Sequence, residues 1–405
     1  MFLMVNAHVF VVDRDSYPVH RDRLFCGVKN PPRINARGIP NPSHYGLIAD
    51  LKAIRKGDLV FFYQMRRNEE KHLRGFRGVF QVISDSFFSD EDIDGVNNSF
   101  GDLGSFNKKV LGKCPFCGTS ISDKTKDVKK MINGKKRKVT IKYCLKCGKE
   151  LMFHILPNRV LIKPLVYYDN PIDDNTAYID RDFIKKKGML WTMLFRKTFG
   201  AGRERSITHI LPEEAEKLLF MFKTLFKEKE LDTFTPYKPK NAQPIKIPLD
   251  TNDKGEVIIE AYLEAWIMEN IDKNIPILRD VIGPVEEIEY FGNNVLYGIG
   301  GEKVDVLVLH KRGDERYKAT VMELKKGKLK ESDVKQIKDY TKWMAQLAFG
   351  DSTKDSKQKI QPTLIGFDTP QKIINFAKKF ITETQPIIIL NYRVEGNTLK
   401  FERVL

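Results

Sequence analysis

Residues 301–327 read GEKVDVLVLHKRGDERYKATVMELKKG, which is two apolar runs joined by a polar turn. Apolar runs of this length bounded by turn residues are typical of buried strands. If the turn is centred on Asp314, then Asp305 and Glu323 are cross-strand neighbours, with Cβ atoms about 5 Å apart. Lys325 lies two residues after Glu323 and therefore shares its face of the strand. The sequence predicts a hairpin with two carboxylates and a lysine on one face.

Two carboxylates this close in an apolar setting repel each other unless a cation lies between them. Mg²⁺ or Mn²⁺ favours such oxygen ligands, with water and a substrate phosphate completing its shell. Lys325 would then orient the attacking water or stabilise charge that builds on the phosphate. We therefore expect Asp305 and Glu323 to be metal ligands in a phosphodiester-cleaving site. The alternative is an ordinary ion pair at the end of a strand.

The Asp-x₁₇-Glu-x-Lys arrangement resembles that of PD-(D/E)XK nucleases. Glu260 begins the expected helix IEAYLEAWIMEN (259–270) and is similar to the first-helix glutamate of that family. Gln336 and Tyr340 are one helical turn apart and resemble the QxxxY motif of RecB-type members. The order of these elements most resembles the catalytic domain of NucS, a mismatch- and branch-directed DNA endonuclease, over roughly 255–395. The N-terminal half does not resemble NucS.

This resemblance implies an α/β nuclease domain with one catalytic centre. Its catalytic residues would be Glu260, Asp305, Glu323, Lys325, Gln336 and Tyr340. The first three of these would hold the Mg²⁺ or Mn²⁺ ion. Glu264 lies one helical turn after Glu260 and is the competing carboxylate on this helix.

Two CxxCG knuckles, 26 residues apart, indicate a second metal site in the N-terminal half. Their thiolates belong to Cys114, Cys117, Cys144 and Cys147. Four thiolates satisfy tetrahedral Zn²⁺ and leave no open position, so we expect a structural zinc ribbon. Paired redox dithiols are the alternative. Asn133 and Gly134, between alternating runs, predict a hairpin whose lysines form either a solvated face or a phosphate-contacting surface.

Six stretches around the knuckles resemble the EVE domain, a PUA-like module related to the YTH readers of modified bases. They are CGVKN (26–30), KGDLVFFYQ (56–64), GFRGVFQVIS (75–84), PNRVLIKPL (157–165), GMLWTMLFRKTFG (188–200) and GRERSITHILPEEAEKL (202–218). The resemblance covers most of the first 225 residues. It implies a PUA-like β-barrel, interrupted by the zinc ribbon, with an aromatic pocket for a flipped, often modified base.

A flipped base needs stacking faces and hydrogen-bonding groups for its Watson–Crick edge. The residues that would serve it are Phe62, Tyr63 and Trp191 as stacking faces, Asn30 at the base edge, and Arg196, Lys197, Arg203 and Arg205 at phosphates. The alternative for Trp191 and Phe62 is a place in the hydrophobic core.

The chain is therefore expected to be multidomain, with an α+β N-terminal half and an α/β C-terminal half. The expected segments are the first part of an EVE-like domain (1–110), a zinc ribbon (111–150), the second part (151–225), a Pro- and Lys-rich linker (226–250) and a nuclease domain (251–405). Within the second part, LPEEAEKLLFMFKTLF (211–226) predicts a helix with proline in its first turn.

The 405 residues carry a net charge of +16, which suggests a polyanionic partner and salt-sensitive binding. DNA is the expected partner, and RNA stays open. A Lys- and Glu-rich composition also occurs in thermophiles, where the two signs are normally balanced. No run of 18 uncharged apolar residues and no leader-like start are present, so we expect a cytoplasmic protein without a membrane span.

These patterns favour a metal-dependent endonuclease that is guided by an EVE-like reader, in modification-dependent restriction or in DNA repair. One catalytic centre cuts one strand, so a double-strand break would require a homodimer or two sequential events. A nucleic-acid-binding module whose nuclease fold is only a scaffold is one alternative. A structure-specific nuclease whose EVE-like domain only grips the backbone is another.

Overall fold

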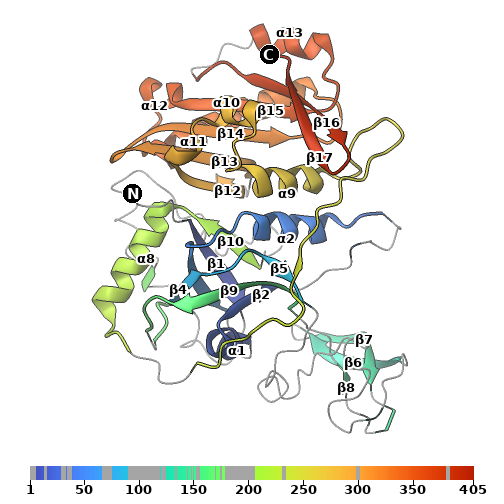
Figure 1. Ribbon diagram of the computed structural model, residues 1–405, viewed down its shortest axis with the longest axis vertical. Coiled ribbons are helices and arrows are strands. Elements are labelled where there is room, and N and C mark those ends of the chain that lie inside the picture. Colours follow the sequence, from blue (N-terminus) through green and yellow to red (C-terminus); the bar gives the residue numbers. More distant parts are fainter. Residues whose placement is uncertain are drawn as a thin grey trace.

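The computed structural model describes two main units and a small separate sheet (Figure 1). The described residues are 6–12, 16–28, 33, 39–65, 75–89, 119, 125–132, 135–143, 145–146, 148, 150–151, 156–168, 170–173, 176–177, 206–229, 234–297, 302–379 and 384–405. We use "N-terminal unit" for the described residues before 251, apart from the small sheet, and "C-terminal unit" for those from 251 onward. No helix among the described residues is long and apolar enough to cross a bilayer.

The N-terminal unit is built on an eight-stranded sheet in the order β10-β1-β3-β4-β9-β5-β11, with β2 paired to β9. Its strands are β1 (Ala7–Val12), β2 (Phe25–Val28), β3 (Leu59–Gln64), β4 (Gly75–Val82), β5 (Phe87–Phe88), β9 (Asn158–Pro164), β10 (Ile207–Ile210) and β11 (Gln243–Pro244). Strands β1 and β3 are parallel, and the other pairs are antiparallel. Strands β3, β4 and β9 lie within three of the six stretches that resemble the EVE domain.

Both faces of this sheet are covered, which explains why its central strands are apolar at successive positions. On one face, Phe10 and Phe62 belong to a core that continues into the C-terminal unit. On the other face, Phe61 stacks at 6.3 Å on Phe222 of α8 (Pro212–Leu225). Helix α8 is the helix that the sequence predicted, with its proline in the first turn. Helices α1 (Ser16–Arg23) and α2 (Pro42–Lys52) also belong to the described part of the unit.

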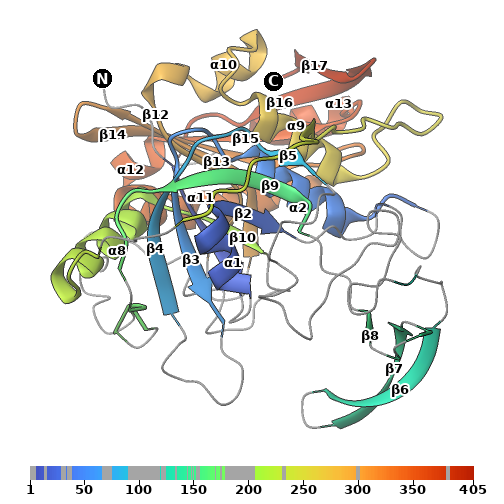
Figure 2. The ribbon, with the colours of Figure 1, turned by 60° about the horizontal axis from the view of Figure 1, so that its bottom comes forward.

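A small three-stranded sheet comprises β6 (Thr125–Ile132), β7 (Lys135–Tyr143) and β8 (Glu150–Leu151). Strands β6 and β7 are antiparallel. β6 ends at Ile132 and β7 begins at Lys135, so the hairpin predicted between the CxxCG knuckles is confirmed. Figure 2 shows this sheet apart from the eight-stranded sheet. All four knuckle cysteines lie outside the described residues.

The C-terminal unit is built on a six-stranded sheet in the order β12-β13-β14-β15-β16-β17. These strands are Ile288–Tyr297, Glu302–Arg312, Glu315–Leu324, Ile360–Gly366, Ile388–Glu395 and Thr398–Arg403. The helices are α9 (Glu260–Asn270), α10 (Pro276–Ile282), α11 (Glu331–Phe349), α12 (Lys354–Gln358) and α13 (Gln371–Lys379), with a 3₁₀ turn at Val285–Glu287. Strands β14, β15 and β16 are parallel and the rest antiparallel, so the sheet is mixed.

The segment expected to be a linker is packed against the N-terminal unit over its described residues. The backbone N–H of Tyr237 donates to Arg23 O at 2.8 Å, and β11 pairs with β5. Ile245, Ile247 and Leu249 are buried. They alternate with the more exposed Lys246 and Pro248, which is a strand-like pattern that the proline- and lysine-rich composition concealed.

Candidate active site

The hairpin of β13 and β14 has the register that the sequence predicted. Val306 is paired with Met322, so the preceding residue, Asp305, faces Glu323 across the strands. Asp305 Oδ2 accepts a hydrogen bond of 2.7 Å from the backbone N–H of Leu324. The turn contains a glycine with φ of 59°, a left-handed conformation that favours glycine. Strand β14 continues into the sheet beside β15, and this places the two carboxylates at the interior end of the hairpin.

Lys325 compensates only one of the two oxygens of Glu323. The Glu323 side chain is 3% exposed, and its Oε1 accepts a hydrogen bond from Lys325 Nζ. Its Oε2 is buried and has no hydrogen-bond partner within the part of the chain that the structure describes. An oxygen buried without a partner costs about 1–3 kcal/mol, and a metal ion beside it would remove this cost. The donor chemistry therefore fits a hard divalent cation.

Glu260 and Glu264, both on α9, point to different partners. Glu260 Oε2 accepts a hydrogen bond of 3.3 Å from the backbone N–H of Lys326, directly after Lys325. Glu264 Oε1 accepts from the side-chain amide of Asn293 at 2.5 Å. Glu260 is therefore the first-helix carboxylate on the side of Lys325. We call Glu260, Asp305 and Glu323 the carboxylate site.

The electrostatics of the carboxylate site indicate too little positive charge. Burial raises the pKa of Asp305 well above its usual range, and the charge on Glu323 raises this pKa further. Burial also raises the pKa of Glu323 and of Glu260, although Lys325 lowers both. For Lys325 itself, burial disfavours the charged form, but Glu323 outweighs it and the pKa rises. One lysine does not neutralise three carboxylates, whereas Lys325 and a divalent ion together would.

As the side chains are placed, no three His, Cys, Asp or Glu groups among the described residues are clustered as ligands around one point. Lys325 occupies only Oε1 of Glu323, so Oε2 stays available to a metal ion. The other oxygens expected to complete the ligand set come from Asp305 and Glu260.

Asp305→Asn is expected to raise the melting temperature at pH 7–8 in EDTA. A carboxyl whose pKa is raised by folding stabilises the folded state at pH values below its unfolded pKa, and loses this contribution as pH rises toward the folded pKa. Asparagine cannot ionise and still accepts the bond from Leu324. A gain of about 1 kcal/mol corresponds to roughly 2–4 °C. Calorimetry between pH 4 and 8 should show the gain disappear near pH 4, and a variant less stable at pH 8 would contradict the assignment.

The QxxxY pair lies on α11, where Gln336 Nε2 donates a hydrogen bond to the Tyr340 hydroxyl. Tyr340 is buried against the sheet. Asp333, in the first turn of the same helix, is a residue that the sequence analysis missed. Its Oδ2 accepts from the backbone N–H of Lys330 at 2.8 Å, and its charge contributes to the raised pKa of Glu323, after burial and Glu260. The only feature of the sequence that marked Asp333 was its place near the expected start of a helix, which does not indicate a functional role.

The structure describes only two of the residues expected to bind a base. Phe62 and Tyr63 are both fully buried. Phe62 packs on Phe80 with ring centroids 5.4 Å apart, and Tyr63 packs on Phe76 at 5.0 Å. Neither ring has a face open to a base, so the structure assigns both to the core and corrects the stacking role. The other expected contacts, Asn30, Trp191, Arg196, Lys197, Arg203 and Arg205, lie outside the described residues.

No family model matches this chain, and no curated protein matches it significantly. Among solved structures it aligns with human THYN1 in complex with 5-methylcytosine-containing DNA (11% identity, TM-score 0.26) and with proteins from Pseudomonas syringae (10%, 0.27) and Pseudomonas putida (10%, 0.26). The alignments cover 53% of this chain, 96% of the THYN1 chain and 98% of the other two. Scores this low do not establish a shared fold, so the EVE resemblance rests on the six sequence stretches.

Proposed function

We propose that this protein is a metal-dependent endodeoxyribonuclease whose N-terminal unit reads a modified, flipped or mismatched base. The observation that supports this most directly is the pairing of Asp305 with Glu323 across the hairpin, with Lys325 on the same face and Glu260 bound to the neighbouring backbone N–H of Lys326. Glu260, Asp305 and Glu323 would hold Mg²⁺ or Mn²⁺. The ion, when bound, would lower the pKa of a water and neutralise charge on the scissile phosphate.

Lys325 has the position and charge for a role at the reacting phosphate. Its ammonium group is held at Glu323 and keeps its proton, because the neighbouring carboxylates raise its pKa. A fixed cation beside the phosphate stabilises the negative charge that develops during attack. We assign it this role rather than that of a metal ligand, because a protonated amine has no lone pair to donate.

The reading function rests on the EVE resemblance and on the net charge of +16. The lysine-rich hairpin β6–β7 would add contacts to the phosphate backbone, which fix a protein on nucleic acid without reading its sequence. The two-unit arrangement then brings recognition and cutting together in one chain. Because the described residues form one carboxylate site per chain, a double-strand break would require two copies or two events.

Incubation with unmodified, methylated, deaminated and mismatched DNA duplexes, and with matching RNA, tests this proposal. We expect cleavage with Mg²⁺ or Mn²⁺, loss of cleavage with EDTA, and preference for one modified or distorted duplex. Binding to these duplexes without cleavage under any metal would favour the alternative, a nucleic-acid-binding module that uses the nuclease fold as a scaffold. If duplexes with the same distortion were cut at the same rate whatever their base modification, a structure-specific nuclease would be favoured.

We also propose that the four cysteines of the two knuckles hold one structural Zn²⁺ ion. The confirmed hairpin between the knuckles supports this proposal. Metal analysis should give about one Zn per chain, and Cys114→Ser should lose the zinc and destabilise the N-terminal unit while the cleavage chemistry remains. Cys26→Ser is the matched control, because Cys26 is buried in strand β2, away from the knuckles, and should keep the zinc. A folded wild type without zinc would refute this site.

A further inference from the structure

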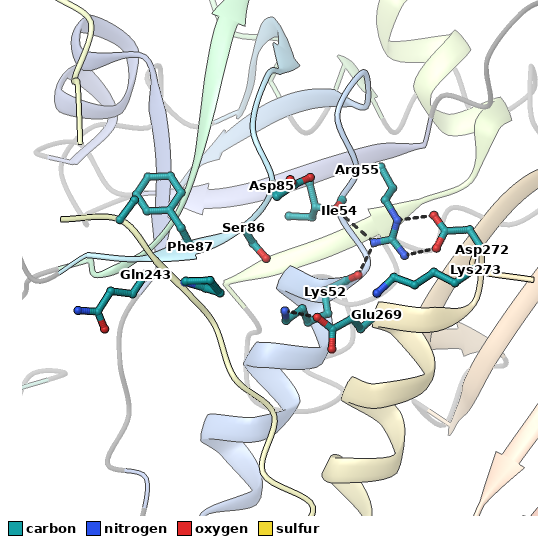
Figure 3. A pocket seen from close by; sticks show the side chains of 12 residues that line it. Lys52, Ile54, Arg55, Asp85, Ser86, Phe87, Gln243, Glu269, Asp272 and Lys273 are labelled. Carbon is teal, nitrogen blue, oxygen red and sulfur yellow. Dashed lines mark hydrogen bonds and ion pairs between the residues drawn. The ribbon is translucent and has the colours of Figure 1, made fainter. Parts of the chain in front are cut away.

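The N-terminal and C-terminal units are joined by ion pairs between α2, its following residues and α9 (Figure 3). Lys52 Nζ contacts Glu269 Oε1 at 2.6 Å. Arg55 binds both oxygens of Asp272, at 2.6 and 2.9 Å, and donates to Met268 O at 2.8 Å. These contacts line one wall of a cavity of about 650 Å³ between the units. They hold α2 against the helix that carries Glu260 and Glu264.

A second set of polar contacts runs through the N-terminal unit and ends at α2. Asp58 Oδ2 lies 2.7 Å from His8 Nε2, and His8 Nδ1 lies 2.8 Å from His209 Nδ1. His209 Nε2 is in turn 3.9 Å from Asp50 Oδ1. All four side chains are buried. Asp58 directly precedes β3, and the other three residues come from β1, β10 and α2, so this set ties the sheet to the helix at the interface.

One side-chain amide continues these contacts into the C-terminal unit. Asn293 Nδ2, on β12, donates to Asp50 Oδ1 at 2.9 Å and to Glu264 Oε1 at 2.5 Å. Asn294 Nδ2 also donates to Glu264 Oε1. Asp50 is 1% exposed and Asn293 is 4% exposed, so water does not replace these bonds. A carboxylate of the N-terminal unit therefore shares one amide group with a carboxylate of α9.

Glu264 is close enough to influence the carboxylate site. Asn293 is paired with Val306 across β12 and β13, so the two amides that hold Glu264 lie on the strand beside Asp305. Glu264 lies one helical turn after Glu260, away from Lys325, and its known donors are the amides of β12. It therefore occupies a place behind the expected ligands. Groups in that position orient metal ligands and tune their affinity.

We propose that Asp50 is a positioning residue for the carboxylate site. By accepting one N–H of Asn293, it fixes the amide that holds Glu264, and so the N-terminal unit sets the metal affinity of the C-terminal unit. This inference rests on the proposed function, because it presupposes that the carboxylate site binds a divalent ion. It adds that the C-terminal unit is not an independent metal-binding module.

Calorimetric titration of the full chain with Mn²⁺, without DNA, tests this positioning role. Asp50→Ala and Asn293→Ala should each weaken Mn²⁺ binding about 10–100-fold, as loss of an outer partner of a metal site typically does. The double variant should be no weaker than Asn293→Ala, because Asn293→Ala already removes the bond to Asp50. Asp50→Asn should bind like the wild type, because its amide oxygen still accepts from Asn293.

Glu269→Gln is the matched control for a general loosening of the interface. It weakens the ion pair with Lys52, which is part of the same α2–α9 contact, and should leave Mn²⁺ affinity unchanged. Wild-type affinity in folded Asp50→Ala, or an equal loss in Glu269→Gln, would overturn the positioning role alone. If Asp50→Ala does not fold, Asn293→Ala decides in the same way. The proposed function and this inference would both be overturned if the wild type bound no Mn²⁺. The same would follow if Glu323→Ala bound Mn²⁺ as tightly as the wild type.

Discussion

Glu323→Ala is expected to reduce metal-dependent DNA cleavage by on the order of 10³-fold or more, with nearly unchanged DNA affinity. The side chain is buried at the interior end of β14, faces Asp305 and holds Lys325. Its removal would take away a metal ligand and the group that orients the lysine. Binding would persist because it depends on the positive charge spread over the rest of the chain.

Lys325→Ala should reduce cleavage to a similar extent but retain Mn²⁺ binding, because the lysine is not a ligand. Single-turnover rates and Mn²⁺ titrations of the same preparations separate these two roles. Glu315→Ala is the matched control, since Glu315 lies at the other end of β14, is exposed, and pairs only at the surface with Lys359 at 3.2 Å. It should cut at the wild-type rate. Cleavage by Glu323→Ala at the wild-type rate in the same Mg²⁺ buffer would make the pair an ordinary strand-end ion pair.

The hairpin that carries this site could be predicted from the sequence because its determinants are local. Side chains alternate with a period of two, and a glycine-containing turn fixed the register, so Asp305 and Glu323 had to meet. The same holds for α9, α11 and the β6–β7 hairpin, whose periodicities or turn residues lie within a few positions of each element. Such features do not depend on the rest of the fold.

The choice between Glu260 and Glu264 could not be predicted, because residues four apart share a helix face. The choice is set by residues far away in the chain: Lys326 binds Glu260 across 66 positions, and Asn293 binds Glu264 across 29. The interface between the units depends on even longer separations, such as 243 positions between Asp50 and Asn293. Composition and periodicity carry no information about such pairs.

The prediction that Phe62 and Tyr63 stack on a base was wrong for a different reason. In a sheet that is covered on both faces, neighbouring aromatic residues point to opposite cores, and both are buried. Phe62 joins the core shared with the C-terminal unit, and Tyr63 joins the core under α8. The sequence showed two adjacent aromatic residues, but it did not show that helices cover both sides of their strand.

Arg55→Ala is expected to lower the free energy of unfolding by about 3 kcal/mol or more, because it breaks a largely buried pair and leaves its partner unpaired. The guanidinium binds both oxygens of Asp272, donates to Met268 O and lies 5.0 Å over the Phe291 ring. The side chains of Arg55 and Asp272 are only 23% and 22% exposed. Urea unfolding followed by tryptophan fluorescence would measure the loss.

Arg312→Ala is the control for the Arg55 prediction, because this arginine makes the same kind of two-bond contact in solvent. Arg312 donates to both oxygens of Glu287 at 2.8 and 3.0 Å, but its side chain is 70% exposed. An exposed pair contributes little to stability, so this variant should unfold close to the wild type. Equal losses in the two variants would show that the contact between α2 and α9 does not hold the units together. A large loss in Arg55→Ala alone would show that burial at the interface, and not the number of hydrogen bonds, sets the strength of this contact.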